Sequence, residues 1–411
     1  MITSNAKTPN LRLLAVSVKY PTLFQTWFIN YLESLELYDL DISVASLFKA
    51  EDNIHPKTSS IKTQRVWSAK IGLPQNLLRC IKYFFTHLFK KSTYNYLSVC
   101  FTSDRNLKEA LQAVLLLPGI SLAPNIIHCH SEKAAFRLLP LLTYFDVPMF
   151  LTFHGLAPEG VSDLSRNKRQ TLYKSIDRVF VNTEFAYNQC KGIVDGDFEV
   201  EIIPQGINLL DFPYKPKKYS FEKPVKILSV GRLDRLKGYQ FAIQAVSNLL
   251  KMGVSIEYTI VGEGLYRDKM VEQIKNLHLS DHVEVKGPLL GTELLYMYHS
   301  SHVFLLPSIE EPGSWAETQG IVIQEAQASG LLTIATKTGG IPECIVDGET
   351  GFLVDQQSPQ AIVEKIGYLL KNQDKWPSWQ LSARKHVEKR FDYRDMGKRL
   401  LSRYEEILSK D

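Results

Sequence analysis

Short apolar runs alternate with helix-like segments along almost the whole chain, and this alternation limits the fold more than any other feature. In the first half, strands are predicted over residues 11–17, 41–47, 126–130, 148–154, 178–182 and 199–203. Helical patterns lie between them at 26–37, 106–116, 132–144 and 166–175, and residues 50–75 read as a loop. Strands that alternate with helices imply a parallel sheet covered by helices.

The pattern restarts after a proline- and lysine-rich stretch at 214–219, which reads as a linker. Strands are then predicted over 226–230, 256–261, 283–286, 303–306 and 331–335, again with helices between them. The fold class is therefore α/β, with two doubly wound, Rossmann-like domains at 1–212 and 225–388 and a linker at 213–224. A last apolar stripe predicts a C-terminal helix over 389–411 that either seals the second domain or crosses back to the first.

Length and composition place the chain among ordinary globular proteins. Its 411 residues are 45% hydrophobic and 22% charged, with a net charge of +4 and no long basic run, which argues against nucleic acid as a partner. Five scattered cysteines without a CxxC pair predict neither a disulfide framework nor a zinc site. No signal-peptide core and no apolar stretch of about 18 residues is present. A cytoplasmic protein is predicted, with membrane contact only from the surface.

A basic turn follows the strand predicted over 226–230. Ligands of doubly wound sheets bind beyond the carboxyl ends of the strands, and Gly231, Arg232 and Lys237 lie at that edge. Gly231 permits a tight turn, Arg232 offers planar bidentate donors suited to phosphate, and Lys237 adds a point charge. Taken alone, a solvated basic loop explains these residues equally well.

Two carboxylates eight positions apart, Glu317 and Glu325, flank the start of a helix predicted over 321–328. If the helix begins near Gly320, its N-terminus presents free N–H groups and a positive dipole end, which suit a phosphate. Glu325 would then accept hydrogen bonds from a diol such as ribose, and Glu317 from sugar hydroxyls. The alternative is two solvated glutamates, but Ile321 and Val322 belong to a helix that is apolar over most of its surface.

Together these motifs resemble the nucleotide-sugar half of glycosyltransferase family 4, whose members are retaining enzymes of the two-domain GT-B architecture. Segments 203–208, 261–264, 338–343 and 347–354 match the same family, and the resemblance is dense from residue 199 to 355. It implies two Rossmann-like domains that face each other across a cleft. It also implies transfer of a hexosyl group from a nucleotide diphosphate sugar to a saccharide or lipid-linked saccharide in cell-surface polysaccharide biosynthesis.

The resemblance assigns roles to individual residues. Arg232 and Lys237 would bind the diphosphate, Glu325 the ribose and Glu317 the transferred sugar. The backbone of Gly320, Ile321 and Val322 would touch the sugar or the distal phosphate, and His154 would contact the donor sugar across the cleft. Two cations and a helix dipole can replace a metal, so neither a metal nor another cofactor is predicted.

The sequence departs from the family pattern in two places. The first strand–helix loop, 19–28, resembles the colanic-acid-type subgroup, but Gln25 replaces the glutamate of that subgroup. Thr318 stands where glycine commonly follows the first glutamate, and residues 310–315 extend the loop before it. These departures leave the sugar preference and the acceptor open.

Other functions stay open as alternatives. A degenerate GT-B protein that only binds a nucleotide sugar is expected to have lost a charged site residue, but all are present. A dinucleotide oxidoreductase would need a complete GxGxxG after a strand, and Gly262 and Gly264 lack the third glycine. A GT-B epimerase or phosphorylase is the remaining alternative.

The segment 77–91 combines apolar and aromatic residues with Arg79, Lys82, Lys90 and Lys91. This composition suits an anionic bilayer, where a lipid-linked acceptor would lie. It also suits an ordinary helix of the first domain that buries Phe84 and Leu88.

Overall fold

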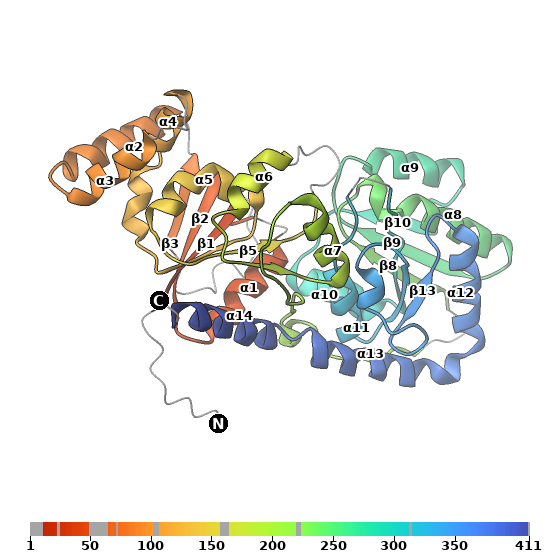
Figure 1. The fold of residues 1–411 in the computed structure, drawn as a ribbon. Helices are drawn as coiled ribbons and strands as arrows, with labels where there is room; N and C mark the ends of the chain where they lie inside the picture. The colour runs from red at the N-terminus through yellow and green to blue at the C-terminus, as the bar shows by residue number, and fades with distance from the viewer. Residues whose placement is uncertain are drawn as a thin grey trace.

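The computed structural model describes residues 11–22, 25–48, 65–70, 73–101, 107–156, 164–218, 223–311 and 315–409. Parts of several segments considered above lie outside these residues, at 23–24, in the 50–75 loop, at 106, at 219–222 in the linker, at 312–314 and at 410–411. Figure 1 shows two α/β units, each with a central sheet, and a long C-terminal helical segment that runs beneath both.

The first unit contains a seven-stranded sheet in the order β3-β2-β1-β4-β5-β6-β7, and every neighbouring pair is parallel. Its strands are β1 (Arg12–Lys19), β2 (Asp41–Phe48), β3 (Arg65–Lys70), β4 (Ile126–Cys129), β5 (Met149–Phe153), β6 (Arg178–Val181) and β7 (Val200–Ile202). The helices around it are α1 (Thr26–Glu36), α2 (Leu73–Thr86), α3 (Lys91–Cys100), α4 (Leu107–Val114), α5 (Glu132–Tyr144), α6 (Arg166–Tyr173) and α7 (Glu184–Ile193).

The second unit contains a six-stranded parallel sheet in the order β10-β9-β8-β11-β12-β13. Its strands are β8 (Val225–Val230), β9 (Ile256–Val261), β10 (Val283–Lys286), β11 (Val303–Leu306), β12 (Leu332–Thr336) and β13 (Phe352–Val354). Its helices are α8 (Tyr239–Lys251), α9 (Arg267–Asn276), α10 (Gly291–Ser300), α11 (Ile321–Ala328), α12 (Pro359–Lys371) and α13 (Trp376–Arg390), and α14 (Tyr393–Leu408) follows. The predicted α/β class with two doubly wound sheets is confirmed.

Alternate side chains of β1 show how each sheet comes to be covered on both faces. Leu14 and Val16 belong to one buried cluster with residues of α5, whereas Leu13 and Ala15 belong to another with residues of α1. Because successive side chains of a strand point to opposite faces, an uninterrupted apolar run is required where both faces are buried. The apolar runs of the sequence therefore mark the central strands.

Some elements were not predicted. The strand β3 lies inside the span read as a loop, because it is a short edge strand with polar or charged residues among its few apolar ones. The helices α3 and α7 and the three-residue strand β13 were also missed.

The C-terminal segment is two helices, and this resolves the choice that the sequence left open. Val387 and Phe391, in and just after α13, pack against Ala326 and Ala328 of the second unit. At Asp392 the chain turns, and its carboxylate accepts a hydrogen bond from the backbone N–H of Arg394 (2.9 Å) to start α14. The helix predicted over 389–411 is thus α14, Tyr393–Leu408, and it crosses back to the first unit.

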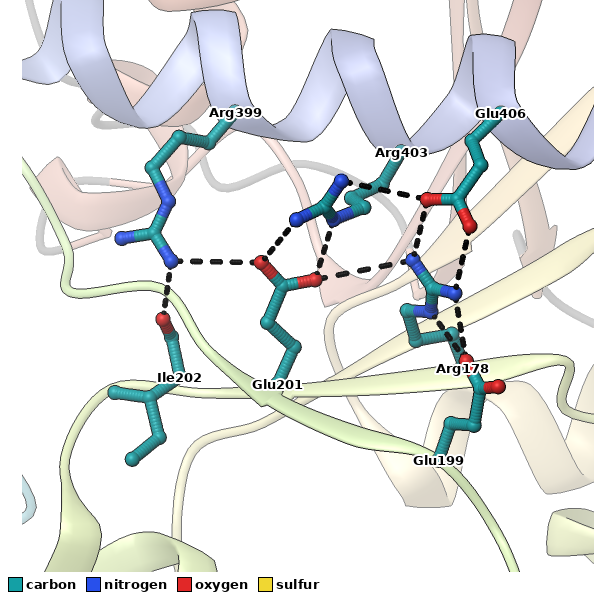
Figure 2. A network of polar contacts seen from close by, with 7 residues as sticks. All are labelled: Arg178, Glu199, Glu201, Ile202, Arg399, Arg403 and Glu406. Atoms are coloured by element: carbon teal, nitrogen blue, oxygen red, sulfur yellow. Dashed lines mark hydrogen bonds and ion pairs between the residues drawn. The ribbon is translucent and has the colours of Figure 1, made fainter.

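Helix α14 is held on the first unit by an apolar face and by an ionic network. Met396, Leu400 and Tyr404 join the cluster that contains α1 side chains, and Tyr404 Oη hydrogen-bonds to Nδ1 of His128 on β4 (2.5 Å). Figure 2 shows the ionic network, in which Arg178 of β6 lies between the carboxylate of Glu199, just before β7, and that of Glu406 on α14.

The members of this network come from three elements. They are Arg178 on β6, Glu201 and Ile202 on β7, Glu199 just before it, and Arg399, Arg403 and Glu406 on α14. Arg403 Nε donates to Glu201 (2.7 Å), and Arg399 Nη2 donates to the carbonyl oxygen of Ile202 (2.6 Å). Side chains far apart in the sequence therefore fix the position of α14.

Replacing Arg178 with alanine should lower the free energy of unfolding by about 2 kcal/mol, because Glu199 and Glu406 lose their common partner. The loss is below that of a fully buried pair because both carboxylates reach solvent. Urea denaturation followed by circular dichroism measures it. Arg166→Ala removes a fully exposed pair with Asp195 and should leave the midpoint unchanged. Equal effects of the two variants would contradict a special role of Arg178.

Candidate active site

The basic turn predicted from the sequence leaves the carboxyl end of β8. Gly231 and Arg232 follow the strand, and Lys237 ends a single 3-10 turn, Arg235–Lys237. The carboxylate of Asp234 accepts a hydrogen bond from the backbone N–H of Lys237 (3.2 Å), and it lies 3.1 Å from Nη2 of Arg232. This capping aspartate was not singled out from the sequence, although an aspartate three residues before a lysine at a turn is a recognisable cap.

The structure brings Lys237 and Glu317 into a direct ion pair between Nζ and Oε2. Their side chains are only 9% and 13% exposed. The ring of Trp315 lies beside both cations of the turn, 5.4 Å from the guanidinium carbon of Arg232 and 5.2 Å from Nζ of Lys237. Three predicted site residues, Arg232, Lys237 and Glu317, therefore lie together around one aromatic ring.

Helix α11 begins beside this cluster. Gly320 precedes it with φ +76°, a left-handed conformation that favours glycine. The next residues, Ile321 and Val322, form the first turn, where backbone N–H groups lack helical partners. The loop after β12 also contacts this cluster, because the backbone N–H of Gly340 donates a hydrogen bond to the carbonyl oxygen of Glu317 (2.8 Å).

Glu325 lies in the second turn of α11 and is buried. Its Oε2 accepts a hydrogen bond from Tyr298 Oη (2.7 Å). Glu325 and Val322 line a groove with Gly231 and Arg232. An apolar wall of the same groove consists of Pro288, Leu289, Leu290 and Leu294. A carboxylate, a basic turn and an apolar wall thus border one groove, which sequence spacing alone did not reveal.

His154 lies directly after β5, at the carboxyl edge of the first sheet. Gln205 Nε2 lies 3.0 Å from its Nδ1, and its Nε2 lies 3.4 Å from Nδ1 of His130. The ring is 4.2 Å from that of Trp27. Burial lowers the pKa of His154 to about 3, so its imidazole is neutral at physiological pH. Both ring nitrogens therefore face protein side chains, and the ring carries no charge.

An open cleft lies between the two units. His154 and Trp27 line it from the first unit, and Arg232 and Trp315 line it from the second. The carboxyl edges of the two sheets therefore face the same cleft, as the GT-B resemblance implied. Within the described residues, no group of three or more His, Cys, Asp or Glu side chains is placed to hold a metal ion.

Several hydrogen bonds cross between the units beside Glu317. Thr183 Oγ1 donates to the carbonyl oxygen of Thr318 (2.7 Å), and the backbone N–H groups of Glu184 and Phe185 donate to the carboxylate of Glu343 (2.8 and 2.9 Å). These contacts were not predicted, although Glu343 belongs to the recognised 338–343 segment.

An amide pair completes the contact between the units. Gln205 N–H donates to Gln319 Oε1, and Gln319 Nε2 donates to the carbonyl oxygen of Gln205, both at 2.8 Å. Gln205 also holds His154, so the contact connects the two edges of the cleft. No sequence signal pairs these two glutamines.

Comparison with known proteins agrees with the fold and with the family resemblance. A model described as "Glycosyltransferase Family 4" matches residues 84–209, and one described as "Glycosyl transferases group 1" matches residues 211–386. The two sheets and the cleft define a two-domain GT-B enzyme. The chain belongs to the glycosyltransferases that these two models describe, and the resemblance stated from the sequence is confirmed.

The relatives and solved structures match between two thirds and nearly all of the chain. The chain is 23% identical over 404 residues to the putative colanic acid biosynthesis glycosyltransferase WcaL of Salmonella typhimurium, covering 94% of this chain and 97% of that protein. It is 24% identical over 283 residues to glycogen synthase of Mycobacterium tuberculosis, covering 67% of each. The structure of Anabaena HepE in complex with UDP and glucose shares the fold with a TM-score of 0.73 at 15% identity, covering 95% of this chain and 98% of that one.

The buried histidines should make the protein sensitive to acid. Burial lowers the pKa of His128, His130 and His154 below the unfolded value of about 6.5, so the unfolded chain binds more protons between that pH and the folded pKa. The free energy of unfolding should therefore fall as pH drops below about 6.5, by up to about 1.4 kcal/mol per pH unit for each histidine. Urea titrations from pH 7.5 to 5.5 measure the slope.

His154→Gln should reduce the change of the free energy of unfolding with pH by the contribution of one histidine. This holds whatever the effect of the substitution on stability at a single pH. The same slope in both proteins would show that His154 is not held neutral in the folded state.

Proposed function

We propose that the protein transfers a hexosyl group, with retention, from a nucleotide diphosphate sugar to a saccharide or lipid-linked saccharide in cell-surface polysaccharide biosynthesis. The relatives named for colanic acid and amylovoran biosynthesis support the pathway, and the HepE complex with UDP and glucose supports the donor class. The observation that carries the proposal is the convergence of Arg232, Lys237 and Glu317 beside the first turn of α11.

The donor fits this geometry from its nucleoside to its sugar. The apolar wall of the groove would cover the base, and Glu325 would accept hydrogen bonds from the ribose diol. Arg232 and Lys237 would bind the diphosphate with the N–H groups of the first turn of α11. An ammonium group has three donors, so Lys237 can contact a phosphate oxygen while it remains paired with Glu317.

The chemical step breaks the bond between the anomeric carbon and the phosphate oxygen. Negative charge grows on the departing diphosphate, where Arg232, Lys237 and the helix dipole stabilise it without a metal ion. The departing phosphate would take the proton of the acceptor hydroxyl on the same face, which preserves the anomeric configuration. Glu317, held by Lys237, positions the sugar and is not an attacking nucleophile. The neutral ring of His154 would face the donor sugar from the opposite side of the cleft.

A panel of UDP-, GDP- and ADP-sugars tests the proposal by calorimetric binding and by release of nucleotide. At least one donor should bind and be turned over in the presence of EDTA, and NMR of the product should show the anomeric configuration of the donor. Binding without turnover would point to the degenerate alternative, and phosphate dependence or free-sugar epimerisation to the other two GT-B activities.

Glu317→Gln should lower kcat with the best donor by about 100-fold or more, because it removes the charge that orients both Lys237 and the sugar. Steady-state kinetics measures the change. Glu257→Gln, in an exposed Lys226–Glu257 pair outside the groove, is the matched control and should keep wild-type kinetics. Unchanged turnover in Glu317→Gln would refute the site assignment.

The proposal includes contact with an anionic membrane surface through α2 and the turn after it. Leu77, Leu78, Ile81, Phe85 and Phe89 are exposed, with Phe85 at 69% and Phe89 at 95%. Phe84, in contrast, packs against the core, so the helix has both a buried and an exposed apolar side. Figure 1 places α2, α3 and α4 at the end of the first unit that lies away from the second sheet.

Charge on this surface has one sign. Residues 73–101 contain four Lys or Arg residues and no Asp or Glu, so this segment alone equals the net charge of +4 of the whole chain. Exposed apolar side chains on a segment that carries only positive charges suit an anionic bilayer. No helix in the described part of the chain is long and apolar enough to cross a membrane.

Phe85→Ser with Phe89→Ser should reduce flotation of the protein with phosphatidylglycerol liposomes by at least tenfold, because two exposed aromatic anchors are lost. Leu265→Ser removes a fully exposed apolar side chain of the second unit and is the control, with wild-type flotation expected. Wild-type protein that fails to float, or floats equally with neutral liposomes, would refute the membrane contact.

A further inference from the structure

Tyr239, the first residue of α8, has a buried hydroxyl without a hydrogen-bond partner in the described part of the chain. Its whole side chain is buried. Two other buried tyrosines of the same unit are satisfied: Tyr258 Oη lies 2.8 Å from Ser229 Oγ, and Tyr298 Oη donates to Glu325 (2.7 Å). A buried donor left unpaired costs stability, so its retention calls for a reason.

The hydroxyl lies beneath the basic turn. A Cβ built on Gly231 would lie 2.9 Å from Tyr239 Oη and 3.8 Å from Lys237 Nζ. Both polar atoms therefore lie close to Gly231, where the missing side chain lets the turn approach the hydroxyl. Gly231 also lines the groove that reaches Arg232 and Glu325. Any other residue at 231 would press against the hydroxyl.

The phenol is suited to donate a hydrogen bond and not to ionise. Burial raises the pKa of Tyr239, and the nearby carboxylates of Asp234 and Glu317 raise it further. Its proton therefore stays in place, and the acceptor it prefers is an anionic oxygen. Among the parts of a nucleotide diphosphate sugar, only the diphosphate carries such oxygens.

We propose that Tyr239 binds the diphosphate of the donor, with Oη donating a hydrogen bond to a phosphate oxygen next to Lys237. This inference rests on the proposed function and adds a neutral third donor to Arg232 and Lys237. The unpaired hydroxyl lowers the stability of the protein without ligand. In return it raises the affinity for the diphosphate, because it is already held in place and loses little conformational freedom on binding.

The experiment uses Tyr239→Phe, which removes only the hydroxyl, and Tyr258→Phe as the matched control. UDP, GDP and ADP are titrated calorimetrically into the full chain, and the tightest is compared with its own nucleoside by competition. Tyr239→Phe should weaken the diphosphate about tenfold, the worth of one hydrogen bond to a charged group, and leave the nucleoside unchanged. Its Tm should equal or exceed that of the wild type, since the lost hydroxyl had no partner.

Tyr258→Phe should show the opposite pattern, with a lower Tm and wild-type affinity, because its hydroxyl bonds Ser229 and not the ligand. The inference is overturned if Tyr239→Phe binds the diphosphate as tightly as wild type, weakens the nucleoside equally, or loses thermal stability. If wild-type protein binds none of the three diphosphates, the proposed function fails, and this inference fails with it. If the wild type binds a diphosphate and Tyr239→Phe binds it equally tightly, the proposed function stands and this inference is wrong.

Discussion

The ion pair between Lys237 and Glu317 is the contact on which the rest of the site depends. Each charge is nearly shielded from water, and an unpaired charge in such a place would be strongly unfavourable. The pair joins a turn after β8 to a loop before α11, 80 positions later. Trp315 lies over the cations of the same turn. The candidate site is therefore held together by contacts within the protein itself.

The loop that carries Glu317 is held from both sides of the cleft. Thr318 accepts a hydrogen bond from Thr183 of the first unit, and Gln319 exchanges two with Gln205. Gln205 in turn contacts His154. The docking of α14 on α1 and β7 fixes the first unit against the second, so these short contacts can form. The geometry of the reacting centre thus depends on a helix whose sequence contains no site residue.

The sequence pattern predicted the strands and helices that are determined by residues close together in the chain. Central strands such as β5 need an apolar run because both faces are buried, and α11 has a glycine start and an apolar surface, so both were found. The short edge strands β3 and β13 lack such a run and were missed. The basic turn and the two carboxylates were also visible.

The sequence pattern did not show which charged side chains form ion pairs with each other. Lys237 was expected at the diphosphate and Glu317 at the sugar, and neither was expected to pair with the other. The roles assigned by resemblance stay predictions, because they describe contacts with a ligand. The amide pair of Gln205 and Gln319 has no sequence signature, since either side chain alone is an ordinary polar residue.

The departure at position 318 is explained by its neighbour across the cleft. A Cβ at Gly155 would lie 2.6 Å from Thr318 Cγ2, so the threonine fits only because residue 155 is glycine. Thr318 Oγ1 also lies 3.4 Å from the carbonyl oxygen of His154. Threonine in place of the usual glycine therefore fills the gap between the units beside His154 and leaves the Lys237–Glu317 pair intact. If the site binds its donor as proposed, Thr318 changes the shape of the cleft near the sugar, where hexoses differ, and leaves unchanged the charges proposed to bind the diphosphate, which all such donors share.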